Sequence, residues 1–164
     1  MRLFLSLSLL FALAACATPY GKDGLTGGYS DSRLAPNVFK VTFEGNGYTN
    51  KQRAGDLALL RGAELTLDHG FKYFVVIDGR VAEQTYQYYS PERTETKMKI
   101  QTQGNVTKVK ANSYTYGGHV YNITTPSAEN TIMAFKKRPQ KVFSYDALYL
   151  YRKITEKYKI KPKY

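Results

Sequence analysis

The chain contains a single cysteine, Cys16, which directly follows an apolar run, and this feature most limits what the chain can fold into. Residues 3–13 are apolar except for Ser6 and Ser8, and Arg2 precedes them. A basic start, a short apolar run and small residues at its end form a signal peptide, since a membrane-spanning helix needs about 20 apolar residues. With no second cysteine an intramolecular disulfide is impossible, so the exported chain must be stabilised by its own core.

The residues around the cysteine, Leu13-Ala14-Ala15-Cys16, match the lipobox of bacterial lipoproteins. The first three suit recognition by the signal peptidase, and the thiol of Cys16 is the nucleophile that takes the diacylglyceryl group. We therefore expect cleavage before Cys16 and stable anchoring through two or more acyl chains. The alternative is a buried core cysteine behind an ordinary signal peptide. By resemblance to the sorting rule of enterobacterial lipoproteins, Ala17 indicates the periplasmic leaflet of the outer membrane rather than the inner membrane.

Removal of residues 1–15 leaves 149 of the 164 residues, which suits one domain. The 15 tyrosines and eight phenylalanines, with no tryptophan, favour a β-rich structure. The formal net charge is +11, and only Arg2 is lost with the leader. Such a surface attracts anionic lipids, envelope polymers or nucleic acid, and the exported location argues against nucleic acid.

The chain after the leader divides into three parts. Residues 16–28 hold four glycines and Pro19, which predicts a flexible tether after the lipidated cysteine. Residues 29–158 are expected to form a single α+β domain, and residues 159–164 a basic tail.

The domain is predicted to begin with a strand, a helix and a second strand. Residues 38–44 are rich in β-branched and aromatic residues, and Gly45-Asn46-Gly47 ends them as a turn. Thr49 and Gln52 form a capping-box pattern, which predicts a helix over residues 50–69 that Gly70 closes. Residues 71–78 are nearly all apolar, so the three elements predict a parallel βαβ unit with a right-handed crossover.

Short Tyr- and Thr-rich runs follow and predict antiparallel hairpins, with tight turns at Gly104-Asn105 and Gly117-Gly118 and strands over residues 85–89, 94–102, 106–116 and 120–125. Residues 131–137 are a further strand candidate before Pro139, and an amphipathic helix follows Ser144. The expected fold class is α+β: a two-layer sandwich whose mixed sheet starts with the βαβ unit and continues with antiparallel hairpins, with two helices packed on one face.

Between residues 28 and 74 the chain resembles an uncharacterised family of small proteobacterial lipoproteins. The resemblance lies in the lipobox and in a run of motifs: Gly28-Tyr29-Ser30, Arg33-Leu34, Phe39, Val41, Phe43, Gly45-Asn46, Thr49, Ala54, Asp56, Ala58-Leu59-Leu60-Arg61, Ala63-Glu64-Leu65-Thr66-Leu67, Gly70-Phe71 and Tyr73-Phe74. Beyond residue 80 it is limited to a strand before a basic-Pro turn and to Tyr145-Asp146-Ala147. The resemblance implies an envelope lipoprotein with no assigned activity.

No catalytic or metal-binding pattern is recognisable in the sequence. A nucleophilic triad would need His69 or His119, and neither lies near a G-x-S-x-G motif. Asp68 and His69 are neighbours that point about 100° apart on a helix, so they do not converge on one ion. We expect His69 to cap the carboxyl end of the helix and the protein to use no metal and no cofactor.

Four polar residues form the candidate site: Asn46, Asp56, Arg61 and Glu64. Arg61 and Glu64 predict a partly buried ion pair that ties down Asp31 or the loop at Gly45-Asn46, with a ligand site as the alternative. Asn46 is expected to serve a turn. Two functions follow: a non-enzymatic binding or structural role at the periplasmic face, or, as the alternative, a small hydrolase or ligand site built from the carboxylates of the first helix.

The carboxyl end is strongly basic. Its cations outnumber Asp146 and Glu156 and comprise Lys136, Lys137, Arg138, Lys141, Arg152, Lys153, Lys157, Lys159, Lys161 and Lys163. A solvated helix face with a frayed tail is one interpretation. The other is a surface for an anionic envelope polymer or lipid; a protein partner is left open, and nucleic acid is not expected.

The lipobox generates a direct prediction. Replacement Cys16→Ser removes the only thiol that can carry lipid, so cells fed labelled palmitate should label the wild-type chain and leave the variant unlabelled. A wild-type chain whose mass shows a bare thiol or a retained leader would contradict the anchor.

Overall fold

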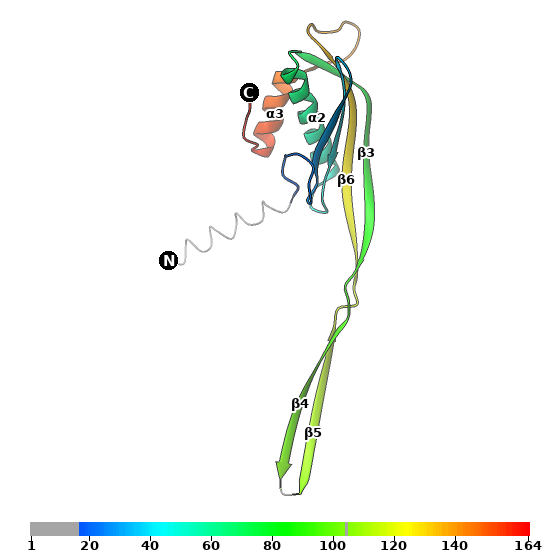
Figure 1. Ribbon diagram of the computed structural model, residues 1–164, viewed down its shortest axis with the longest axis vertical. Helices are drawn as coiled ribbons and strands as arrows, with labels where there is room; N and C mark the ends of the chain where they lie inside the picture. Colours follow the sequence, from blue (N-terminus) through cyan, green and yellow to red (C-terminus); the bar gives the residue numbers. More distant parts are fainter. Residues whose placement is uncertain (1–16, 104) are drawn as a thin grey trace, which may run out of the picture. The chain divides into compact units, whose positions relative to one another are not determined.

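The computed structural model describes residues 17–103 and 105–164 (Figure 1). These residues form two compact units. The larger unit runs to Gln84 and resumes over Thr124–Tyr164, and the smaller one comprises Thr85–Ile123. The strands expected over residues 94–102 and 106–116 pair only with each other and do not join the larger sheet.

The α+β class is confirmed. Five strands form one sheet and two form another, and two helices accompany the larger sheet. The elements in chain order are β1 (Gly28–Ala35), β2 (Val38–Glu44), α2 (Lys51–Asp68), β3 (Tyr73–Tyr89), β4 (Arg93–Gln103), β5 (Val106–Tyr116), β6 (Val120–Phe135), β7 (Tyr145–Asp146) and α3 (Ala147–Tyr158).

The larger sheet has the strand order β1-β2-β6-β3-β7. β2 pairs antiparallel with β1 on one side and with β6 on the other. The amide of Lys72 donates to the carbonyl of Phe135, and the hydroxyl of Thr125 donates to the carbonyl of Gln84, so β3 begins where β6 ends and the two run in opposite directions. β2 and β3 therefore run parallel to each other.

The predicted βαβ unit is thus present in a split form. The strand, helix and second strand follow in the expected order, but β6 lies between β2 and β3 and hydrogen-bonds to both. The chain between β3 and β6 is long enough to return β6 to this central position. β1, which the sequence analysis does not predict, forms the edge beside β2.

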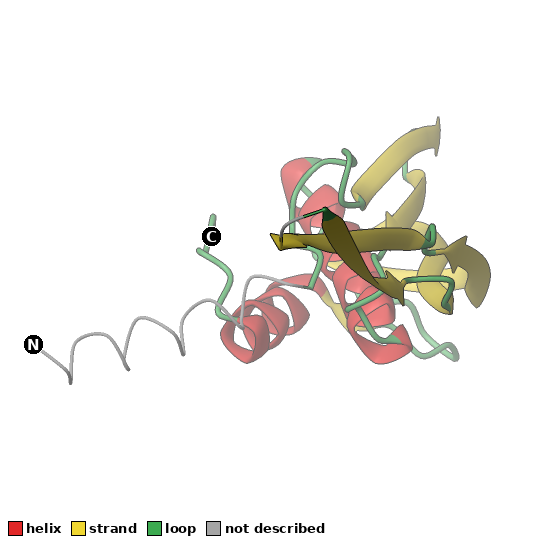
Figure 2. Cartoon of the chain, turned by 90° about the horizontal axis from the view of Figure 1, so that it is seen from below, coloured by secondary structure: helices red, strands yellow, loops and turns green. Residues whose placement is uncertain are grey.

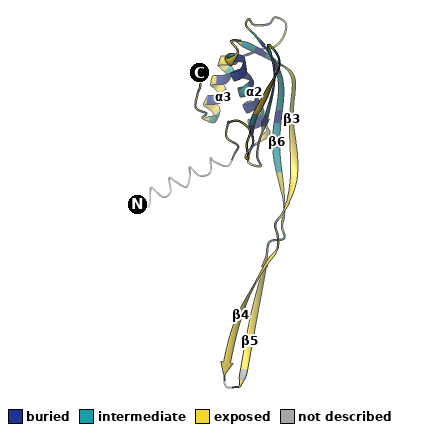
Figure 3. Ribbon diagram, in the orientation of Figure 1, coloured by how far each residue is buried: buried dark blue, intermediate teal, exposed yellow. Residues whose placement is uncertain are grey.

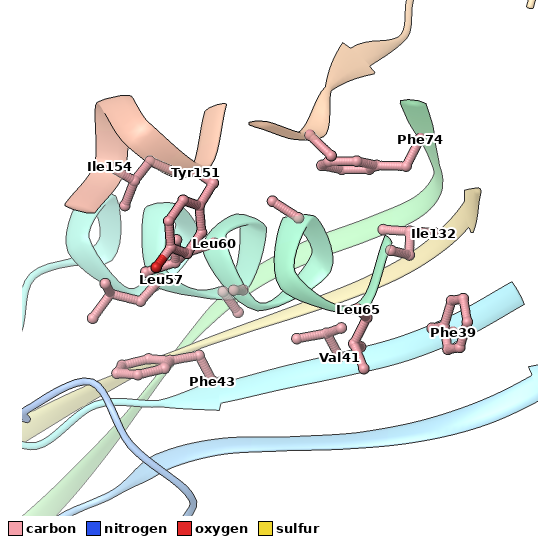
Figure 4. Packing of buried hydrophobic residues seen from close by; sticks show 14 of the residues in the cluster. Phe39, Val41, Phe43, Leu57, Leu60, Leu65, Phe74, Ile132, Tyr151 and Ile154 are labelled. Carbon is pink, nitrogen blue, oxygen red and sulfur yellow. The ribbon is translucent and has the colours of Figure 1, made fainter. Parts of the chain in front are cut away.

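The core lies between the sheet and α2, and α3 packs beside α2 on the same side (Figures 1 and 2). Every second residue of β2 points into it, so Phe39, Val41 and Phe43 are buried, as period-two alternation requires. Figure 3 shows that the burial concentrates on α2 and the strands behind it. Figure 4 shows side chains from five elements in one cluster, including Leu57, Leu60, Phe74, Ile132, Tyr151 and Ile154.

Both ends of α2 are capped by specific contacts. The side chain of Asn50 accepts a hydrogen bond from the amide of Arg53 at 2.8 Å, so Asn50 is the N-cap and the predicted capping box at Thr49 and Gln52 is wrong by one residue. His69 is the C-cap, and its Nδ1 lies 2.8 Å from the carbonyl oxygen of Leu65. Gly70 follows with φ of +75°, the left-handed conformation that closes a helix.

The carboxyl-terminal residues fold back onto the helices. Asp146 caps α3 by accepting from the amide of Tyr149 at 3.0 Å. The amide of Lys163 donates to the hydroxyl of the buried Tyr151, and the side chains of Lys163 and Tyr164 both donate to Asp68. Residues 159–164, predicted as a basic tail, are thereby joined to both α2 and α3.

Residues 17–27, predicted as part of a flexible tether, also make specific contacts with the domain. Thr18 is fully buried; its amide donates to Thr49 Oγ1 and its hydroxyl to the carbonyl of Thr26. The ring of Tyr20 lies against Tyr29 with centroids 5.1 Å apart. This segment therefore does not act as a free linker between residue 17 and the domain.

The smaller unit is a hairpin whose two long strands, β4 and β5, pair over eleven residue positions from Arg93↔Tyr116 to Gln103↔Val106. The predicted tight turn at Gly117-Gly118 is wrong, because β5 pairs with β4 and not with β6. Both glycines have positive φ, but the segment hydrogen-bonds across to Ser90, through the amide of Gly118 and the carbonyl of His119. At the other predicted turn, Gly104 lies outside the described residues. Cross-strand hydroxyl pairs such as Thr94 with Thr115 and Thr96 with Ser113 connect the strands at 2.9 Å.

The core predicts a contrast between two leucines. Leu60→Ala removes a fully buried side chain from α2 and should lower the free energy of unfolding by about 3 kcal/mol. Leu148→Ala on α3, where the side chain is 36% exposed, should cost less than about 1 kcal/mol. Urea unfolding followed by helical circular dichroism measures both, and equal losses would contradict the position of the core.

Candidate functional site

Arg61 is the centre of the most connected polar group on α2. Its Nε donates to Asp31 of β1 and its Nη1 to Glu64, both at 2.8 Å, and its guanidinium lies 4.4 Å from the ring centroid of Tyr29. Glu64 is only 7% exposed. The predicted ion pair is present, and of the two tie points considered, the structure selects Asp31. Arg61 therefore fastens the edge strand β1 to the helix.

The surroundings of Arg61 and of the nearby Tyr20 determine the protonation states of both side chains. Burial, followed by the charge of Glu64, raises the pKa of Tyr20 above its usual range, so the phenol stays neutral. Burial works against the charge of Arg61, but the hydrogen bonds to Asp31 and Glu64 outweigh it and raise the pKa of Arg61. The guanidinium of Arg61 is thus held between two carboxylates and covered by an aromatic ring, which suits a structural role. Asp31 and Glu64 both accept hydrogen bonds from it, so neither is placed to act as a general base.

Asp56 belongs to a different contact. Its Oδ2 accepts from Lys157 Nζ and from Tyr158 Oη, both at 2.7 Å, and so joins α2 to α3. A shallow depression beside it is lined by side chains such as Gln52, Leu59 and Val76, and Asp56 is its only carboxylate. The pair of carboxylates that most glycoside hydrolases use is not formed there.

Asn46 serves the turn between β2 and α2, as predicted. Its Oδ1 accepts from the amide of Tyr48 at 3.0 Å and from the hydroxyl of Thr49 at 3.1 Å. Gly45 is required beside it, because a Cβ there would lie 2.7 Å from Thr49 Cβ. The amide of Asn46 donates to the hydroxyl of Thr18, so the turn also binds the amino-terminal segment.

The four candidate residues therefore do not converge. Arg61 and Glu64 meet each other, Asp56 meets α3, and Asn46 meets Thr18. Cys16 and the recognition residues Leu13, Ala14 and Ala15 lie outside the described residues.

Other classes of site are also missing from the described residues. Over residues 17–103 and 105–164, no three His, Cys, Asp or Glu side chains are grouped so that they could hold a metal ion. No helix in this part of the chain is long and apolar enough to cross a membrane.

Part of the basic carboxyl end is neutralised within the protein. Lys157 pairs with Asp56, Lys163 with Asp68 and Lys153 with Glu156. Burial of Asp68 opposes its ionisation, but the hydrogen bonds from Lys163 and Tyr164 lower its pKa below the usual value. The three lysines are thus committed to intramolecular carboxylates.

Sequence reasoning missed two features. One is the burial of Thr18, which no feature of the sequence near Cys16 indicates. The other is a group of lysines on one face of the β4–β5 hairpin, where Lys97, Lys99, Lys108 and Lys110 line a groove. The alternation Lys-Met-Lys-Ile before the turn and Lys-Val-Lys-Ala after it could have revealed this face, because both runs have period two.

Comparison of the chain with protein-family models, with curated proteins and with solved structures finds no match. The resemblance to small proteobacterial lipoproteins therefore stays a prediction.

The Arg61 contacts predict a stability effect with a built-in control. Arg61→Leu leaves the carboxylate of Glu64 buried without its partner and should cost about 2–3 kcal/mol, somewhat below the range for fully buried pairs because Asp31 is partly exposed. The double variant Arg61→Leu, Glu64→Leu should regain most of that loss in urea unfolding. If the double variant were as unstable as the single one, the cost would not come from the stranded charge.

Proposed function

We propose that the chain is a lipid-anchored, non-enzymatic protein of the bacterial envelope, with a binding or structural role at the periplasmic face of the outer membrane. The observation that carries the proposal is the buried position of Thr18, two residues after the cysteine of the lipobox.

The position of Thr18 brings the domain close to the anchor. Its amide donates to Thr49 at 3.1 Å, its hydroxyl donates to Thr26 at 2.8 Å, and Arg53 Nη2 donates to its carbonyl at 3.4 Å. Two residues of extended chain span about 7 Å, so an acylated Cys16 would hold this side of the domain at the headgroups. A free linker of 12 residues would instead allow about 20 Å.

Two exposed apolar side chains flank Thr18. Leu25 lies in the turn closed by the amide of Gly27 on the carbonyl of Gly24, next to the carbonyl that Thr18 contacts, and it is fully exposed. Tyr48 is 75% exposed, and its amide is bound by Asn46. An aliphatic side chain and a tyrosine suit the apolar and headgroup levels of a bilayer surface respectively. We infer that both contact lipid.

The non-enzymatic part of the proposal rests on how the carboxylates are used. The alternative, a small hydrolase or ligand site on the first helix, needs Asp56 and Glu64 to face one substrate. In the structure Glu64 is occupied by Arg61 and Asp56 by Lys157 and Tyr158. No observation favours that alternative.

The proposed membrane location and partner rest on the sequence and on the charge of the chain. Ala17 after the lipobox cysteine supports the outer membrane over the inner one. Lys136, Lys137 and Lys161 form no salt bridge within the described part of the chain, and these cations support attraction to an anionic envelope polymer or lipid. Capture of a partner by crosslinking in intact envelopes tests this part directly.

The proposed bilayer contact can be tested by tryptophan fluorescence without a background signal, because the chain has no tryptophan of its own. In the lipidated protein, reconstituted in vesicles with brominated lipids, Tyr48→Trp should be strongly quenched. Tyr149→Trp on α3, at a tyrosine 64% exposed, should be quenched little and is the matched control. Equal quenching of the two variants, or none at the Tyr48 position, would contradict the proposed contact.

A further inference from the structure

The hairpin of β4 and β5 has two chemically different faces. Pairing of Lys97 with Asn112, Lys99 with Lys110 and Gln101 with Lys108 places all four lysines on one face, because alternate residues of a strand share a side. The opposite face carries Met98, Ile100, Val109 and Ala111 between rows of Thr and Ser. The charge is therefore concentrated on one side of the ribbon.

Among residues 17–103 and 105–164, none of these four lysines forms a salt bridge. From residue 96 to residue 128 the sequence contains four lysines and no acidic residue. Glu95, at the end of the lysine row, accepts a hydrogen bond from the hydroxyl of Tyr116 at 2.7 Å. Lys99 and Lys110 face each other directly across the strands, an arrangement of like charges that weakens a hairpin. An anionic ligand would remove that repulsion.

The lysines line a groove together with residues that can recognise a sugar chain. Gln101 and Asn112 offer amide donors and acceptors, and Tyr114 offers a ring face and a hydroxyl. Along each strand the lysines repeat at about 7 Å, and across the strands their Cβ atoms lie about 5 Å apart. A flexible polymer with repeated anionic groups can follow such a groove and meet both rows of lysines.

We propose that this lysine groove, formed by Lys97, Lys99, Lys108 and Lys110 with Gln101, Asn112 and Tyr114, binds an anionic polysaccharide. The ammonium groups bind its phosphate, sulfate or carboxylate groups, and the amides and tyrosine bind its hydroxyls and rings. The inference deepens the proposed binding role and moves its centre from the carboxyl end to the hairpin. It does not depend on the lipid anchor, because every residue of the groove belongs to the hairpin unit.

The test uses the full chain in an uncharged detergent, with dextran sulfate as the probe and uncharged dextran as its control. The wild-type protein should bind dextran sulfate with an affinity that falls as salt rises, and should not bind dextran. The quadruple variant Lys97→Gln, Lys99→Gln, Lys108→Gln, Lys110→Gln should bind roughly tenfold more weakly or worse. A matched variant, Lys22→Gln, Lys51→Gln, Lys72→Gln, Arg80→Gln, loses the same charge from exposed positions of the larger unit and should lose less than about threefold.

Three results would overturn the proposal: equal losses in the two quadruple variants, no binding of dextran sulfate by the wild type, or tighter binding to vesicles of anionic lipid than to the polymer. If the hairpin variant fails to fold, hydrogen exchange of the wild type decides, because dextran sulfate should slow exchange of the β4 and β5 amides. Unchanged exchange there at saturating polymer would also overturn it. Failure of palmitate labelling would remove the anchor and leave this result unaffected.

Discussion

Burial of α2 is the constraint on which the larger unit depends. With a single cysteine in the sequence the domain has no internal disulfide, so the apolar face of α2 must hold β2, β6, β3 and α3 together. The polar contacts are arranged around this helix: Arg61 fastens β1, Asp56 fastens α3, and the turn before the helix, at Asn46 and Thr49, binds Thr18. The position of the amino-terminal segment is thus a consequence of where α2 packs.

Sequence patterns predicted what local periodicity and turn chemistry determine. The period-two run of β2, the apolar face of α2 with its end at Gly70, and the cap at His69 could all be predicted from the sequence. So was the pair of Arg61 and Glu64, because residues three apart on a helix meet. Fold class followed from these elements.

What sequence could not supply depends on contacts between distant segments. β1 is polar and mostly exposed, and only its pairing with β2 makes it a strand. The insertion of β6 between β2 and β3 leaves the crossover pattern unchanged, so nothing local distinguishes it. Residues 17–27 have a linker's composition, yet Thr18 is buried by side chains more than 25 residues away. The lysine groove could have been predicted, because it requires only the register of the hairpin and the two runs of alternating lysines can be seen in the sequence.

The proposals combine into one account, in which a leader would direct lipidation of Cys16, the segment after the lipid would bind the domain instead of extending away from it, and the basic hairpin would bind a polymer. The central claim is the close contact between domain and bilayer. Neutron reflectometry of the lipidated protein on a supported bilayer tests it most directly. The account predicts protein density that begins at the headgroups without an intervening water layer; a water-filled gap of about 20 Å, the span of a free 12-residue linker, would contradict it.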